Sequence, residues 1–164
     1  MSHNKNKCVK QCIVPGNRQI PETRIRSRQV VVAKNPDEYY SMHPTWGFSS
    51  CDTEQWPLCQ EYAGTSFWNL ILPRMKHLET MTWAEILVKD NKHNHSISTE
   101  SLNKVAQDRL KAKYVEQDAV ISLTLDATSR LYGYMNGSTF YILWFDSHHG
   151  DNDSCVCRSR LKHS

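Results

Sequence analysis

The chain has 164 residues, a mass of 19.1 kDa and a formal net charge of +3, and 39% of its residues are hydrophobic. This length allows one domain with a proper core, or one domain with an arm, and excludes two substantial domains. No apolar run approaches the roughly 18 residues of a membrane span, and residues 1–10 lack the apolar segment of a secretory signal. We therefore expect a cytoplasmic protein with no membrane partner.

The cysteine pattern indicates free thiols. Without an export signal, reduced cysteines are expected in place of disulfides. The spacings also lack the paired C-x-x-C arrangement of a typical zinc site, so no cofactor is predicted, and a structural zinc stays an open alternative. The six cysteines are Cys8, Cys12, Cys51, Cys59, Cys155 and Cys157.

The first part of the chain is strongly basic. Residues 1–30 contain seven Lys and Arg residues against a single acidic residue, Glu22. Residues 1–22 also contain Pro15 and Gly16 and show no helical period, so we predict a mobile basic arm over this range. Such an arm suits a polyanionic partner, although a solvated tail explains the same composition.

A strand is predicted after the arm, at the start of a single domain that spans residues 23–164. Residues 23–33 begin with strict polar and apolar alternation and are rich in β-branched side chains. Arg24, Arg26 and Arg28 would share one face of this strand. Because like charges side by side repel, this arginine ladder is expected to face an anion. The anion would be supplied by RNA phosphates, by an acidic partner or by the chain's own acidic segment 37–61.

Residues 35–66 are predicted to be irregular and rich in aromatic side chains. Three prolines and two glycines interrupt any long element in this range. The aromatic side chains either stack on nucleotide bases or pin the segment onto the domain, and pinning is the more common role.

Two helices are predicted next. The first begins at Ser66, carries apolar residues at three- and four-residue steps up to Leu78, and is interrupted at Pro73. The second is short and begins at the capping box that Thr82 and Glu85 form.

A third helix is predicted to begin at Ser98 or Thr99. Its apolar positions, which include Leu102 and Leu110, face the core. Its basic side chains are expected on the exposed side: Lys104, Arg109, Lys111 and Lys113.

The hydrophobic period then changes from helical to strand-like. Residues 119–125, 129–135 and 138–146 each read as a strand, and residues 154–161 are a possible fourth. Asn136-Gly137 is a strong hairpin signal, because a type I′ turn needs positive φ at both central residues. The fold class predicted is α+β, with helices packed on one side of an antiparallel meander sheet.

Polar, chemistry-bearing residues gather at the ends of these strands. Asp146 and His149 follow the most apolar strand, and Arg130 lies on the strand before it. A loop just before the third helix contains Lys92 and His95. Loops at element boundaries are common places for functional residues, so we expect these segments to form one site.

Cleavage of RNA fits these residue types. The 2′-hydroxyl is the nucleophile, so the protein must supply a base, an acid and a cation for the phosphate. We predict His149 and His95 as the acid and base, since histidine acts either way near neutral pH. Arg130 would clamp the phosphate, and Asp146 would orient an imidazole and raise its pKa. Lys92 and the arginine ladder would contact the RNA.

A purely structural role, a metal site or a binding role would each account for the same residues. Asp146 and the residues after it could form a polar turn, and Arg130 could pair with Asp126 or Asp146 for structural reasons. A divalent cation would make the protein a metal-dependent nuclease. Its ligands would be Asp146, Asp151, Asp153 and His149. A different class is a non-enzymatic module that binds nucleic acid or protein.

The sequence from residue 67 to the end resembles the RelE/ParE-type toxin superfamily, a group of small bacterial and mobile-element proteins. An Arg-x-x-Gly strand and a Phe-x-x-Leu-Trp-x-Asp-x-x-His strand end carry the resemblance. In this chain the residues are Arg130, Gly133, Phe140, Leu143, Trp144, Asp146 and His149.

This resemblance implies a metal-independent endoribonuclease that cleaves messenger RNA, often on the ribosome, and that an antitoxin protein neutralises. It also carries an RNA-binding role over to Arg158 and Arg160 in the basic tail. The long N-terminal part of the chain departs from the family pattern, and some relatives poison a topoisomerase and cleave nothing.

Overall fold

The structure is a computed structural model that describes residues 38–151 and 154–157. The predicted arm at 1–22, the strand at 23–33 and the tail from Arg158 onwards therefore lie outside the described residues. None of the described helices combines the length and the apolar character that a membrane span requires.

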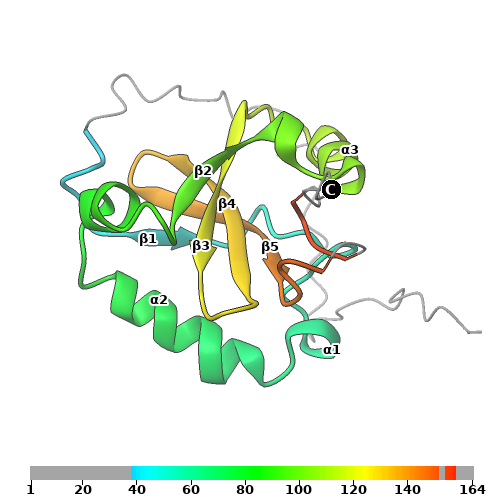
Figure 1. Cartoon of the computed structure of the whole chain (residues 1–164), viewed down its shortest axis with the longest axis horizontal. Coiled ribbons are helices and arrows are strands. Elements are labelled where there is room, and N and C mark those ends of the chain that lie inside the picture. Colours follow the sequence, from blue (N-terminus) through cyan, green and yellow to red (C-terminus); the bar gives the residue numbers. More distant parts are fainter. Residues whose placement is uncertain (1–37, 152–153, 158–164) are drawn as a thin grey trace, which may run out of the picture.

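A five-stranded mixed sheet with flanking helices forms the described domain, which confirms the α+β class (Figure 1). The strand order is β1-β5-β4-β3-β2, with β1 parallel to β5 and all other neighbours antiparallel. The strands are β1 (Thr45–Gly47), β2 (His95–Ser98), β3 (Ala119–Thr124), β4 (Arg130–Asn136) and β5 (Thr139–Asp146).

The predicted meander of three strands is confirmed as β3, β4 and β5. Its β4–β5 hairpin turns at Gly137, whose φ of 62° is the left-handed conformation that the Asn-Gly signal requires. The possible fourth strand at 154–161 is represented in the described part by a single bridge between Leu102 and Cys157.

Strand β2 replaces the predicted loop around His95. The four residues His95–Ser98 are mostly polar and exposed, so no apolar alternation marks them as a strand. Their strand conformation comes from pairing with β3, with His95 opposite Ser122 and Ser98 opposite Ala119.

Helical segments occur before and after β2. The π-helices are η2 (Phe67–Ile71) and η3 (Glu85–Lys89), and η4 (Thr99–Ser101) is a 3-10 turn. The α-helices are α1 (Gln60–Ala63), α2 (Leu72–Leu78) and α3 (Lys104–Ala112).

The helix starts agree with the sequence only in part. The capping box is confirmed, because the Glu85 carboxylate accepts from the Thr82 amide at 2.9 Å and the Glu85 amide donates to the Thr82 hydroxyl at 3.4 Å. The third helix, by contrast, begins later than predicted. Its cap is Asn103, whose side-chain oxygen accepts from the Ala106 amide at 2.7 Å.

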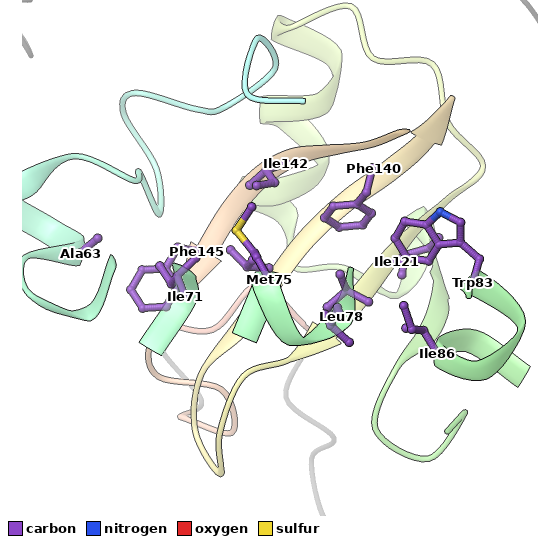
Figure 2. Close-up of a cluster of buried hydrophobic side chains, with 12 residues drawn as sticks. Ala63, Ile71, Met75, Leu78, Trp83, Ile86, Ile121, Phe140, Ile142 and Phe145 are labelled. Atoms are coloured by element: carbon purple, nitrogen blue, oxygen red, sulfur yellow. The ribbon is translucent and has the colours of Figure 1, made fainter. Parts of the chain in front are cut away.

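The helices are divided between the two faces of the sheet, which corrects the expectation that they pack on one side. One hydrophobic cluster contains Ile71 and Met75, near and on α2, together with Phe140 of β5 (Figure 2). The other contains Ala106 and Leu110 of α3. A helix following β2 can cross to either face, and the sequence periodicity marks a buried stripe without saying which face it covers.

The segment before α1 covers the outer edge of β5. Beyond the parallel pairing of β1, the Asp52 amide donates to the Leu143 carbonyl at 2.9 Å, and the Phe145 amide donates to the Trp56 carbonyl at 2.8 Å. The Trp56 side chain is buried, and Trp46 packs edge-on against Phe140. The prediction that these aromatics pin the segment to the domain is confirmed for both tryptophans.

Candidate functional site

The candidate site lies on the face of the sheet that α3 covers. Strand register places His95, Ser122 and Tyr132 side by side on three neighbouring strands. Arg130 is the partner of Asp146 on the next pair of strands. Directly opposite residues in an antiparallel pair project from the same face. The register therefore brings together residues of β2, β4 and β5 that are far apart in the sequence.

Tyr132 is the centre of the hydrogen bonds in this cluster. Its side chain is fully buried, and its hydroxyl contacts His149 Nδ1 at 3.2 Å and Cys157 Sγ at 3.0 Å. Burial, together with the nearby Cys157, raises the pKa of Tyr132 far above its usual value. The hydroxyl therefore stays protonated and acts as a hydrogen-bonding group, not as a base.

His149 is half-buried in the loop after β5, where its backbone amide donates to the Thr128 carbonyl at 2.8 Å. Its pKa is lowered from the ordinary value, first by burial and then by the charge of Arg130, with a smaller contribution from His95. Asp146 raises the pKa of His149, as predicted, but the lowering causes outweigh it. The imidazole is therefore neutral near pH 7.

Arg130 is held by the turn that joins β3 to β4. Its Nη1 donates to the backbone carbonyls of Asp126 at 2.6 Å and Ser129 at 2.9 Å. No carboxylate within the described ranges forms an ion pair with it. The alternative of a structural pair with Asp126 is thus met only through the main-chain oxygen of Asp126.

Asp146 holds the backbone around the site. Its side chain is buried, Oδ1 accepts from the His148 amide at 2.9 Å, and Oδ2 accepts from the Val156 amide at 3.0 Å. Both oxygens thus bind main-chain groups, and neither contacts an imidazole ring among the bonds of the described residues. A polar turn describes this residue better than the predicted role of orienting a histidine.

The turn before β2 and the first residue of β2 contain two further predicted site residues. Lys92 and His95 are both exposed, and His93 Nδ1 lies 2.6 Å from Asp90 Oδ1. The other residues predicted to contact RNA lie outside the described ranges. They are Arg24, Arg26, Arg28, Arg158 and Arg160.

Metal binding has little geometric support where the chain is described. Among residues 38–151 and 154–157, no group of three or more His, Cys, Asp or Glu side chains is placed to hold a metal ion. Cys51, Cys59, Cys155 and Cys157 are free thiols, and Cys8 and Cys12 lie outside the described ranges. The predicted set with Asp146 also needs Asp153, which the structure does not describe.

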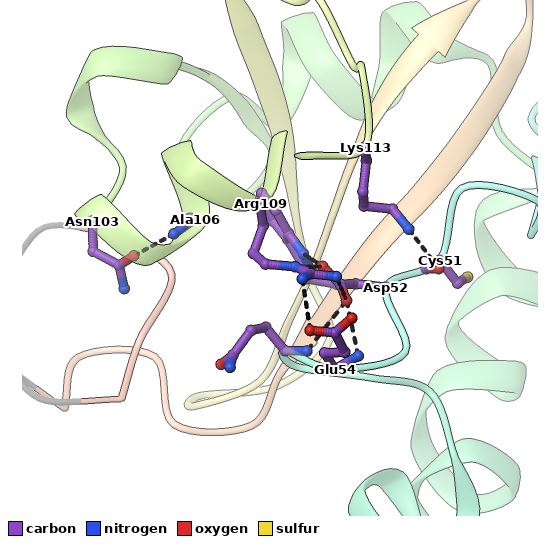
Figure 3. Close-up of polar contacts among 9 residues, drawn as sticks. Cys51, Asp52, Glu54, Asn103, Ala106, Arg109 and Lys113 are labelled. Carbon is purple, nitrogen blue, oxygen red and sulfur yellow. Dashed lines mark hydrogen bonds and ion pairs between the residues drawn. The ribbon is translucent and has the colours of Figure 1, made fainter. Parts of the chain in front are cut away.

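A second polar cluster has a structural role, and it corrects the prediction for Arg109 (Figure 3). This arginine was expected on the exposed side of its helix, but its side chain is only 19% exposed. Its Nε and Nη2 donate to Asp52 at 2.7 and 2.8 Å, and its Nη1 donates to Glu54 at 2.8 Å. Asp52 and Glu54, both in the acidic segment 37–61, therefore form ion pairs with Arg109 of α3.

The signals that sequence reasoning missed were mostly long-range. Cys157 contacts Tyr132 across 25 positions, and Arg109 contacts Asp52 across 57. No local pattern encodes such contacts. Tyr132 was recognisable, since it lies two residues after Arg130 and so shares its face of the strand.

No family model, curated protein or solved structure matches the chain. The resemblance to the RelE/ParE-type superfamily therefore stays a prediction that rests on the residues quoted for it.

Proposed function

We propose that this chain binds RNA and cleaves single-stranded or messenger RNA without a metal, through attack of a 2′-hydroxyl on the adjacent phosphate. One observation carries the proposal: the register sets His95, Ser122 and Tyr132 side by side, and the Tyr132 hydroxyl contacts His149 Nδ1 at 3.2 Å. Arg130 and His95 both lower the pKa of His149. Three separate segments thus contribute to one electrostatic environment.

His149 is suited to act as the base. Burial and the charge of Arg130 lower the pKa of His149, so its imidazole is neutral near pH 7, as a base must be. If the Tyr132 hydroxyl accepts from Nδ1–H and donates to Cys157 Sγ, the lone pair of Nε2 is available to take the proton of the 2′-hydroxyl.

His95 and Arg130 supply the remaining functions. As the 2′-oxygen bonds to phosphorus, the bond to the 5′-oxygen breaks, and His95 donates a proton to that leaving oxygen. The products are a 2′,3′-cyclic phosphate and a 5′-hydroxyl. Arg130 stabilises the charge that develops on the phosphate oxygens, because its guanidinium remains charged and can bind two oxygens at once.

The proposed biological setting follows from the resemblance. We place the protein in the cytoplasm as a toxin-type ribonuclease, with the ribosome and an antitoxin protein as proposed partners. Expression of the wild-type chain in a bacterial host should then arrest growth, and His149→Gln should relieve the arrest at equal protein level.

The test of the chemistry is cleavage of a labelled single-stranded RNA by the purified protein, with and without a chelator. The wild-type protein should cleave in both conditions, and His149→Gln and Arg130→Ala should each lose about 100-fold in rate. His77→Gln is the matched control, since His77 is an exposed histidine of α2, which packs on the opposite face of the sheet.

The same experiment separates the alternatives. Cleavage that disappears with the chelator would support a metal-dependent nuclease. Intact RNA, bound with an affinity that falls steeply as salt rises, would instead support a non-enzymatic binding module. Cleavage that survives in His149→Gln would refute the assigned base.

A further inference from the structure

The turn between β3 and β4 is closed by the side chain of Asp126. Its Oδ1 accepts from the Thr128 amide at 2.9 Å and from the Ser129 amide at 2.7 Å. A short carboxylate that binds amides two and three residues ahead is the arrangement that makes aspartate a turn residue.

This one turn holds two groups of the candidate site. The carbonyls of Asp126 and Ser129 accept the Nη1 of Arg130, at 2.6 and 2.9 Å. The carbonyl of Thr128, between them, accepts the backbone amide of His149 at 2.8 Å. Two carbonyls of this turn therefore hold Arg130 at the start of β4, and a third holds the loop that follows β5.

We propose that Asp126 is a positioning residue of this site: its carboxylate closes the turn at 126–129, and the turn fixes Arg130 and His149 relative to one another. The inference rests on the proposed function, because the relative position of these two groups matters to catalysis only if both act on RNA. The Asp126 residue is exposed; its carboxylate accepts from backbone amides of the turn, and it is its backbone carbonyl that contacts Arg130.

The physical argument is one of preorganisation. An arginine side chain has many rotamers, and a guanidinium that must be ordered at each turnover lowers the rate. The two carbonyls restrict Arg130 before substrate binds, and they face it only while the turn keeps its shape. Asparagine can preserve that shape, because its side-chain oxygen accepts the same amide bonds. Glutamate cannot, because its carboxylate is one methylene farther from the amides.

Two variants distinguish the effect of the turn's shape from the effect of the negative charge on Asp126. Asp126→Asn keeps the acceptor and removes the charge, and Asp126→Glu keeps the charge and displaces the acceptor. The readout is the pKa of His149, followed by NMR titration of its ring in the absence of RNA. The charged groups that act on His149 are Arg130, His95 and Asp146, and Arg130→Gln gives the reference for loss of the arginine.

We expect Asp126→Glu to raise the pKa of His149 toward the value in Arg130→Gln, and Asp126→Asn to leave it at the wild-type value. The cleavage rate should fall about tenfold or more in Asp126→Glu and stay within about twofold in Asp126→Asn, as small misplacements of catalytic groups predict. Asp126→Ala, which lacks any acceptor, should behave like Asp126→Glu. Amide spectra establish that each variant is folded.

An unchanged pKa of His149 in Asp126→Glu and Asp126→Ala would overturn the inference, and so would an equal rise in Asp126→Asn. A raised pKa with an unchanged cleavage rate would overturn the positioning role in catalysis. Because the titration involves no RNA, a wild-type protein that cleaves nothing would refute the proposed function while the test of the turn still gives its own answer.

Discussion

Leu143 and Trp144 are consecutive residues of β5, yet both side chains enter the hydrophobic cluster on the α3 side of the sheet. The cause is a register shift: Tyr132 pairs with Trp144 and Gly133 pairs with Ile142, so Leu143 is an extra residue in its strand. A bulge of this kind places two successive side chains on one face.

The bulge decides which residues reach the candidate site. Phe140 and Ile142 face the α2 side, and uninterrupted alternation would have placed Asp146 on that side too. With one residue inserted, Phe145 takes the α2 side and Asp146 faces the same way as Arg130 and Tyr132. The loop with His149 then begins above the buried tyrosine.

Replacing Gly133 with alanine should be strongly destabilising. A Cβ at Gly133 would lie 2.3 Å from the Tyr141 carbonyl oxygen, which is backbone, and 2.6 Å from the Phe140 ring. We expect a loss of about 2–3 kcal/mol, typical of overpacking that the backbone cannot relieve. Gly47→Ala is the comparison, because the nearest atoms that its Cβ would meet belong to the Tyr141 side chain and not to the backbone. Equal urea midpoints for the two variants would contradict this account of the Arg-x-x-Gly motif.

Removal of Arg109 should cost far more than removal of an exposed lysine on the same helix. Asp52 has a fully buried side chain, and burial by itself raises its pKa, but the bonds from Arg109 and from backbone amides lower it on balance. Arg109→Ala leaves this carboxylate buried and unpaired, with an expected loss of about 3–5 kcal/mol. Lys104→Ala breaks only an exposed pair with Asp108 and should cost less than about 1 kcal/mol. Urea unfolding of both variants measures the difference.

His149 should make the protein less stable in mild acid. Because the pKa of His149 is lowered by folding, the unfolded chain binds the proton more readily once the pH falls below the ordinary value of about 6.5. The contribution of His149 is therefore complete above that pH and decreases as the pH falls toward its folded pKa.

His149→Gln cannot take up this proton. The stability difference between the wild-type protein and this variant should thus shrink between pH 7.5 and pH 5, measured by urea unfolding and with the exposed His77→Gln as the control for histidine replacement. A difference that stays constant over this range would contradict the lowered pKa.

Tyr132→Phe should distinguish a role of the hydroxyl in RNA cleavage from a role in stability. It removes the hydroxyl that contacts His149 and Cys157, with an expected cost of about 1 kcal/mol in stability and about a tenfold lower rate of RNA cleavage. Tyr134→Phe is a close control on the same face of β4, since it loses a hydroxyl bond of 2.8 Å to Ser50. It should lose similar stability and keep the cleavage rate. Equal effects of the two variants on cleavage would argue against a role for Tyr132 at the site.

Local sequence patterns were sufficient to predict the central meander of three strands and the start of the helix at Thr82. Alternating β-branched and aromatic residues predict β3, β4 and β5, and Asn136-Gly137 predicts the turn because only such residues adopt positive φ cheaply. The capping box at Thr82 was equally readable, since both of its bonds join residues three positions apart. Arg130 and Asp146 both act on the pKa of His149, and their neighbourhood was readable because Arg130 begins the strand before the one that ends at Asp146.

Only the tertiary structure decided the remaining features. The polar residues of β2 form a strand because they pair with β3. The face of the sheet that α3 covers is set by the packing of Ala106 and Leu110. Asp52 pairs with Arg109, which lies 57 positions away in the sequence. The bulge at Leu143 places the Asp146 side chain on the same face of the sheet as Arg130 and Tyr132. Periodicity and turn chemistry act over a few residues. Strand pairing, the face that a helix covers and buried ion pairs depend instead on which backbone groups and side chains distant segments of the chain bring into contact.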